Sequence, residues 1–103
     1  MKSKIENVLI SLGFNPSLKG FVYLVYVVNY LFDCHHTPSE VSITNDLYKA
    51  ASFKFYVKPP AIERCIRSSI KSAQLTDNKG LLMTNSNCVG YIYYLVKNQE
   101  EKK

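Results

Sequence analysis

The chain has 103 residues, of which 47% are apolar and 20% are charged. This length and composition predict one small domain with a single core and exclude two domains. Thirteen lysines and arginines against eight aspartates and glutamates give a net charge of +5, which favours an acidic partner, with nucleic acid the first to consider. The three cysteines form no C-x-x-C pair, which excludes a disulfide framework and a zinc knuckle and favours a reducing, cytoplasmic location.

Neither a secretory leader nor a membrane span is predicted. The chain opens on a polar stretch, 1–4, and no small-residue cleavage site follows it. The most apolar run, 21–32, is much shorter than the roughly 20 residues that cross a bilayer. We interpret this run as a buried helix, because the pattern continues from Pro16 to Asp33, and its β-branched and aromatic content leaves a strand as the alternative.

Apolar residues recur at helical spacing along most of the chain and predict a mostly helical domain. Gly13 suits the position after a first helix, Pro60 suits the first position of a later helix, and Thr84 begins a capping segment for the last helix. The polar stretch 76–80 is expected to be a turn, and 98–103 a frayed, charged tail. The first two predicted helices cover 3–12 and about 17–33. After the turn at 37–39, two short helices are expected, with a break near residue 48. The next helix covers 60–74, and the last runs from the cap at 84–86 to residue 95.

The segment 60–74 lies in the middle third of the chain, where nearly all of the excess charge is found, and it has an amphipathic pattern. Residues 1–41 are neutral, 42–74 carry +4 and 75–103 carry +1. At about 100° per residue, the apolar and the charged residues of 60–74 fall on adjoining arcs, so that one side can pack on a core while the other faces outward. The apolar arc holds Ile62, Cys65, Ile66, Ser69, Ile70 and Ala73, and the charged arc holds Glu63, Arg64, Arg67 and Lys71.

Two interpretations of this helix remain open. A solvated face with an ion pair between Glu63 and Arg67, one turn apart, explains the spacing alone. However, a short helix at about 49–55 and a turn at 56–59 precede it with helix-turn-helix spacing, in which the second helix enters the DNA major groove by its N-terminus. An arginine fork matches O6 and N7 of guanine, and a glutamate can accept from cytosine N4. On this interpretation Glu63, Arg64 and Arg67 contact bases, and Lys54, Lys58 and Lys71 contact phosphates, together with Lys49.

Several blocks of the sequence resemble a known family. They are the S-I-T-x-x-L-Y segment at 42–48, the stretch I-E-R-C-I-R-S-S-I at 62–70, L-K-G-F-V-Y-L at 18–24, and T-N-S at 84–86. In these blocks the chain resembles, over about residues 5–97, the C-terminal DNA-binding effector domain of the response regulator that initiates endospore formation in Firmicutes. The resemblance implies an all-α, compact bundle of about six helices, of the winged-helix-like effector-domain type, with a helix-turn-helix whose penultimate helix reads DNA.

The family also implies partners and roles. By position, Glu63, Arg64 and Arg67 match the family's base-contacting residues. Relatives activate or repress early sporulation genes, often as tandem dimers on adjacent sites, with the last helix near the dimer contact. Four features depart from the pattern. No phosphorylated receiver is present in 1–103, the stretch 57–60 (Val-Lys-Pro-Pro) replaces small hydroxylated residues at the turn, and the loop before the last helix is shorter. The last helix also has tyrosines at positions 91, 93 and 94 where relatives are more polar, so a different dimer surface is expected.

Other candidate sites receive less support. Adjacent residues such as Cys34, His35 and His36 rarely converge on one metal ion, so we expect an exposed turn there and no metal site. No orienting group or oxyanion site accompanies them, so no catalytic residue and no cofactor are predicted. Cys65 is expected to be a small core residue.

The tyrosines offer a further surface. The repeat of Tyr at positions 23, 26 and 30 favours the core or a subunit contact over stacking on single-stranded nucleic acid. In the last helix, Tyr91, Tyr93 and Tyr94 cannot all face inward, so Tyr91 and Tyr94 are the candidates for self-association.

The sequence therefore predicts a single helix-turn-helix effector domain that is not an enzyme. The expected function is a transcription regulator that binds double-stranded DNA sequence-specifically, with 60–74 as the recognition helix and with homodimers on tandem sites and the transcription machinery as expected partners. The alternative is a receiver-less interaction module that pairs with a full-length relative, or antagonises it, without binding DNA tightly itself.

Overall fold

The computed structural model describes residues 1–101, which are helical apart from loops and one isolated antiparallel bridge between Thr76 and Leu82. The all-α prediction is therefore confirmed, with five α-helices and two short helices among the described residues in place of about six helices. In chain order the elements are α1 (Lys2–Ser11), α2 (Lys19–Asp33), the 3-10 helix η1 (Pro38–Glu40), the π-helix η2 (Ile43–Tyr48), α3 (Lys49–Phe55), α4 (Pro59–Ala73) and α5 (Asn85–Glu101).

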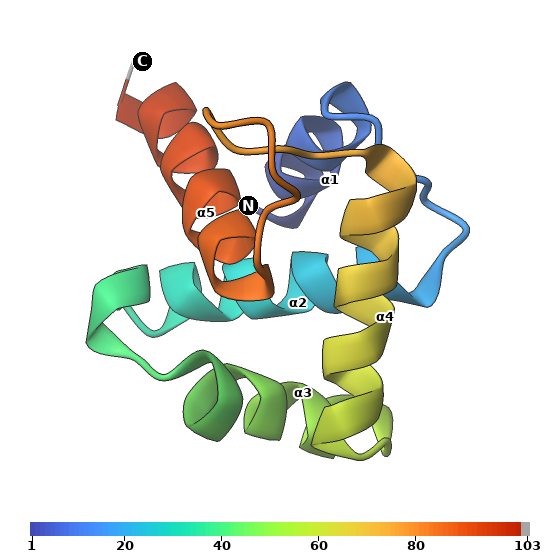
Figure 1. Ribbon diagram of the computed structural model, residues 1–103. Coiled ribbons are helices and arrows are strands. Elements are labelled where there is room, and N and C mark those ends of the chain that lie inside the picture. Colours follow the sequence, from blue (N-terminus) through green and yellow to red (C-terminus); the bar gives the residue numbers. More distant parts are fainter. Residues whose placement is uncertain (102–103) are drawn as a thin grey trace.

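Helix α2 is the centre of the fold and contacts each of the other four α-helices. In Figure 1 it crosses the middle of the molecule, with α1 and α5 on one side, α3 on the other and α4 across its N-terminal end. Eight of its fifteen residues are buried, which confirms the buried helix predicted from the apolar run and rules out the strand. None of the helices in residues 1–101 is long and apolar enough to cross a membrane.

The ends of the first helices follow local backbone chemistry. Gly13 has a φ of 94°, and its N–H donates to the Ile10 carbonyl over 3.0 Å, so it ends α1 as predicted. Helix α2 begins at Lys19, two residues later than predicted. The reason is a turn in which the Asn15 carboxamide oxygen accepts hydrogen bonds from the backbone N–H and the hydroxyl of Ser17, over 3.0 and 2.8 Å.

The predicted break near Tyr48 is the point at which the π-helix η2 passes into α3. The start of η2 is capped in both directions: the Ser42 hydroxyl accepts from the Asn45 N–H over 3.1 Å, and the Ser42 N–H donates to the Asp46 carboxylate over 2.7 Å. These reciprocal bonds explain why a polar S-I-T-N-D segment begins a helix.

The last helix is longer than the sequence predicts. Helix α5 continues past Leu95 to Glu101, so the frayed tail expected over 98–103 is helical over 98–101, and 102–103 lie outside the described residues. An ion pair between Lys4 of α1 and Glu100 of α5 fastens this end to the first helix. Because the two residues lie far apart along the chain, local sequence gives no sign of this contact.

Helices α2 and α4 approach each other closely at Gly20. A Cβ atom at this position would lie 2.1 Å from the Ser69 hydroxyl oxygen and 2.2 Å from the Cys65 carbonyl oxygen, both on α4. No residue except glycine therefore fits without moving α4. The glycine of the L-K-G block sets the distance between the central helix and the charged helix.

Candidate nucleic-acid interface

The connection between α3 and α4 is a three-residue turn built by local chemistry. Tyr56 ends α3 in the left-handed conformation, with a φ of 58°, and the Ser52 hydroxyl donates to the Val57 carbonyl, which ties the turn back to α3. Lys58 then adopts extended backbone angles as the N-cap of α4. Pro59 and Pro60 fill the first turn, where backbone N–H groups have no helical partner, so the lack of an N–H there costs nothing. The helix begins one residue earlier than predicted.

Helix α4 separates its residues by face, as the sequence predicts. Its isoleucines, Ile62, Ile66 and Ile70, are at most 1% exposed and lie in the core. Arg64 and Arg67 are exposed on the other side. Cys65 is half-buried and packs against the core, as expected of a small core residue. Four other elements, α2, α3, α5 and η2, contact α4 and hold it in place, so its arginines project from a fixed helix.

Glu63 and Arg67 form an ion pair one helical turn apart, with 2.9 Å between Oε1 and Nη1. The side chains are 35% and 64% exposed, so water screens the pair and its contribution to stability is about 0.3–0.5 kcal/mol. Its main effect is on position, because it holds the Arg67 guanidinium beside the carboxylate. Arg64 has no such partner among the described residues.

Asn85 fastens the start of α5 to α4, which sequence reasoning missed. Its side-chain nitrogen donates to the backbone carbonyl of Glu63 over 2.9 Å and to the Tyr48 hydroxyl over 2.8 Å. Tyr48 is 3% exposed, and burial raises the pKa of its hydroxyl. One carboxamide therefore joins three of the blocks that carry the family resemblance, 42–48, 62–70 and 84–86. From the sequence, the T-N-S motif predicts only a helix cap and not this link between helices. Thr84 does supply that cap, because its hydroxyl accepts a hydrogen bond from the Asn87 N–H over 3.1 Å.

The net positive charge of the chain is concentrated on α3, the turn and α4. Residues 49–74 hold six cations and one carboxylate, so this segment alone accounts for the net charge of +5, and the rest of the chain is balanced. Lys58 and Lys71 are exposed at the start and in the last turn of α4. Lys54 is also exposed, but it lines a groove against α2 and does not lie on α4. The structure thus brings Glu63, Arg64, Arg67 and Lys71 onto one helix and leaves Lys54 to the side.

The remaining sequence candidates lie elsewhere. Cys34, His35 and His36 form an exposed turn, as predicted, and residues 1–101 hold no group of three side chains able to bind a metal ion. Of the tyrosines in α2, Tyr23 is buried and packs on Phe55 with 5.1 Å between ring centroids, which supports the core interpretation.

The tyrosines of α5 divide as expected. Tyr93 is buried and stacks on Phe32 with 4.6 Å between centroids. Tyr91 and Tyr94 are 40% and 47% exposed. Two aromatic side chains therefore stand on the outer surface of the last helix.

A basic helix held outward on a small all-helical domain is the pattern of a DNA-binding regulatory domain, and comparison with protein families supports this class. The match to the family described as "Sporulation initiation factor Spo0A C terminal" covers residues 5–88, so the chain belongs to that family of DNA-binding, transcription-regulating domains. The family is not an enzymatic one. The match confirms the resemblance drawn from the sequence motifs, and it stops within α5 before Tyr91, so the exposed tyrosines lie beyond the matched region.

Proposed function

We propose that this protein is a sequence-specific regulator of transcription whose α3–turn–α4 unit is a helix-turn-helix, with α4 in the major groove of double-stranded DNA. The observation that carries the proposal is the outward face of α4, where Arg64 and Arg67 are exposed while the isoleucines of the same helix are anchored in the core. A rigid helix that presents arginines is what groove recognition requires. The mechanism is occupancy of a site and recruitment of the transcription machinery.

Each charged group has a role fixed by its chemistry. Arg64 and Arg67 offer planar pairs of N–H donors that fit O6 and N7 of guanine, and the Glu63 carboxylate can accept from cytosine N4. Lys58, Lys71 and Lys54 contact phosphates, which position the domain without reading sequence. Because Arg67 is already paired with Glu63, its guanidinium enters the groove partly oriented, whereas Arg64 becomes ordered on binding.

A pair of matched substitutions tests the division of roles. A selection from random duplexes at moderate salt first defines the preferred site. Arg64→Ala is then expected to weaken binding to that site by about 1–3 kcal/mol and to relax the base preference, because a bidentate base contact is lost. Lys58→Ala is expected to weaken binding to all duplexes alike and to lower the slope of log K against log salt by about 1.

The result that contradicts base readout is an equal loss on preferred and scrambled duplexes for Arg64→Ala. Thermal unfolding followed by circular dichroism serves as the control, since both residues are exposed and neither substitution changes the core. If no salt-dependent binding to any duplex occurs while the fold is intact, the proposal fails as a whole.

The second candidate is an interaction module that uses α5, which the exposure of Tyr91 and Tyr94 favours. On this interpretation the protein pairs with a full-length relative, or antagonises it, through these aromatic side chains without binding DNA tightly itself. Sedimentation velocity separates the two functions: association without DNA that the double substitution Tyr91→Ser and Tyr94→Ser abolishes supports the module, and association only on tandem duplex sites supports the regulator.

A further inference from the structure

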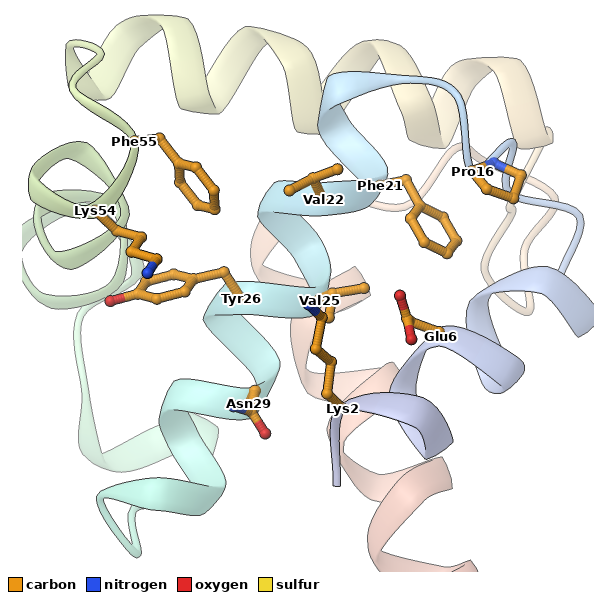
Figure 2. A pocket seen from close by; sticks show the side chains of 10 residues that line it. All are labelled: Lys2, Glu6, Pro16, Phe21, Val22, Val25, Tyr26, Asn29, Lys54 and Phe55. Carbon is orange, nitrogen blue, oxygen red and sulfur yellow. The ribbon is translucent and has the colours of Figure 1, made fainter.

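A groove of about 480 Å³ lies on the side of α2 between α1 and the end of α3. Figure 2 shows Lys54 and Phe55 entering it from the α3 side and Lys2 and Glu6 from α1, with side chains of α2 between them. The volume falls within the range of small-ligand pockets. The lining consists of Lys2, Glu6, Pro16, Phe21, Val22, Val25, Tyr26, Asn29, Lys54 and Phe55.

The floor of this groove, formed by α2, is mostly apolar, with Asn29 as a polar side chain among its residues. Phe21 and Val25 are each 4% exposed, and Val22, 46% exposed, stands at the surface of the groove. At the α3 end, the ring of Phe55 lies against the ring of Tyr26, with 5.4 Å between centroids and a nearly perpendicular arrangement. An apolar group of a ligand that binds here would leave water and contact aliphatic and aromatic side chains, which favours binding.

The two walls differ in charge. On α1, Lys2 and Glu6 are one helical turn apart and opposite in charge, so this wall contributes no net charge. On α3, Lys54 is exposed and forms no ion pair within residues 1–101, and the only carboxylate that lines the groove is Glu6 on the opposite wall. The groove therefore combines an apolar floor with one uncompensated cation at its α3 end.

We propose that this groove binds an amphiphilic monoanion, such as a medium-chain alkyl carboxylate, with the carboxylate at Lys54 and the chain along Val22 and Val25 toward Pro16. The single cation selects one negative group, and the apolar floor selects a hydrocarbon chain. A dianion gains nothing further, because the second wall offers as much negative charge as positive charge.

The site is coupled to the surface that we propose for DNA. Lys54 is a proposed phosphate contact, and Phe55 directly precedes Tyr56, the left-handed residue that starts the turn into α4. A carboxylate on Lys54 competes with a phosphate for the same cation, so ligand and DNA weaken each other's binding by the same factor. This coupling rests on the proposed function, but binding of the anion does not.

The test uses decanoate and its neutral counterpart decan-1-ol, with the protein alone. Titration followed by backbone amide chemical shifts is expected to show saturable shifts confined to the groove for decanoate. Lys54→Gln is expected to weaken the affinity for decanoate about two- to fivefold, as loss of one exposed charge contact does, and to leave the affinity for decan-1-ol unchanged. Lys79→Gln, an exposed lysine in the loop between α4 and α5, is the matched control and leaves both unchanged.

A substitution in the floor completes the design. Val22→Asp places a carboxylate on an exposed position of the groove, so the fold is retained while binding of both probes is lost. Shifts scattered over the molecule, decanoate binding that Lys54→Gln does not weaken, or no saturation overturns the proposal. Measuring DNA affinity afterwards with and without decanoate keeps the failures distinct: decanoate that binds without affecting DNA contradicts the coupling alone.

Discussion

Gly20→Ala adds a single methyl group at the point where α2 and α4 come closest. The new Cβ would lie 2.2 Å from the Cys65 carbonyl oxygen, and ordinary contact begins at 3.4 Å, so the two helices must part by about 1 Å, the difference between these values. Because the obstacle is backbone, no side-chain rotation relieves it. Overpacking of a core costs about 1–3 kcal/mol, and the better helix propensity of alanine returns at most about 1 kcal/mol of that.

Because the obstacle is backbone, the upper end of the overpacking cost, about 3 kcal/mol, applies, and the gain in helix propensity of about 1 kcal/mol leaves a net loss of about 2 kcal/mol in the free energy of unfolding. This loss corresponds to a fall in Tm of roughly 10 °C for a domain of this size. Urea denaturation followed by circular dichroism measures the first quantity, and thermal scans the second. Since the shift falls on α4, affinity for the preferred duplex is expected to fall as well in conditions where the protein remains folded.

The chain offers a matched control at Gly90, inside α5. There the nearest neighbour of an added Cβ is the Pro38 Cβ at 3.8 Å, an ordinary contact, so Gly90→Ala should stabilise the protein by about 0.5–1 kcal/mol through helix propensity alone. Adding Ser69→Gly to Gly20→Ala removes the hydroxyl at 2.1 Å but leaves the carbonyl, so it should not restore stability. A Gly20→Ala protein as stable as the parent would refute the close approach.

Two further predictions concern buried polar groups. Asn85→Ala leaves the buried Tyr48 hydroxyl without its donor, so the free energy of unfolding measured in urea should fall by about 1–3 kcal/mol. Adding Tyr48→Phe removes the hydroxyl that has lost its donor and should recover part of that loss. Equal stability of the single and double variants would contradict the assigned hydrogen bond. Burial raises the pKa of the Cys88 thiol to about 12, so this thiol stays protonated at pH 8. A thiol reagent at that pH should label the exposed Cys34 rapidly and Cys88 only when the protein unfolds. Rapid labelling of Cys88 in the folded protein would show that this side chain is not enclosed.

Local rules predicted those parts of the structure that depend on neighbours in sequence. The two faces of α4, the glycine after α1 and the cap at Thr84 each follow from residues within one or two helical turns. The exposed arginines were found for the same reason, because the position of a residue on a helix face depends only on spacing. The Glu63–Arg67 pair is local in the same sense.

Contacts between distant segments were not predictable in this way. Helix α5 continues past the predicted end at residue 95, and the ion pair that holds this extension, between Lys4 and Glu100, joins opposite ends of the chain. The charge of Lys54 predicts a phosphate contact, and only the packing of Phe55 on α2 shows that Lys54 also borders a groove. Two residues of the family blocks, Gly20 and Asn85, carry no charge, so nothing in the sequence alone indicates the roles that they have in the structure.

These last two residues explain why the recognisable blocks extend well outside the charged helix. Gly20 fixes how near α4 lies to α2, and Asn85 fastens the N-terminal half of α4 to α5 and η2. An arginine that reads a base edge must be placed to within a fraction of an ångström, and its own helix cannot supply that precision without supports on more than one side. The spacing between the blocks is therefore set by helix packing, and a change at either support should alter DNA affinity even though neither residue lies on the outward face of α4.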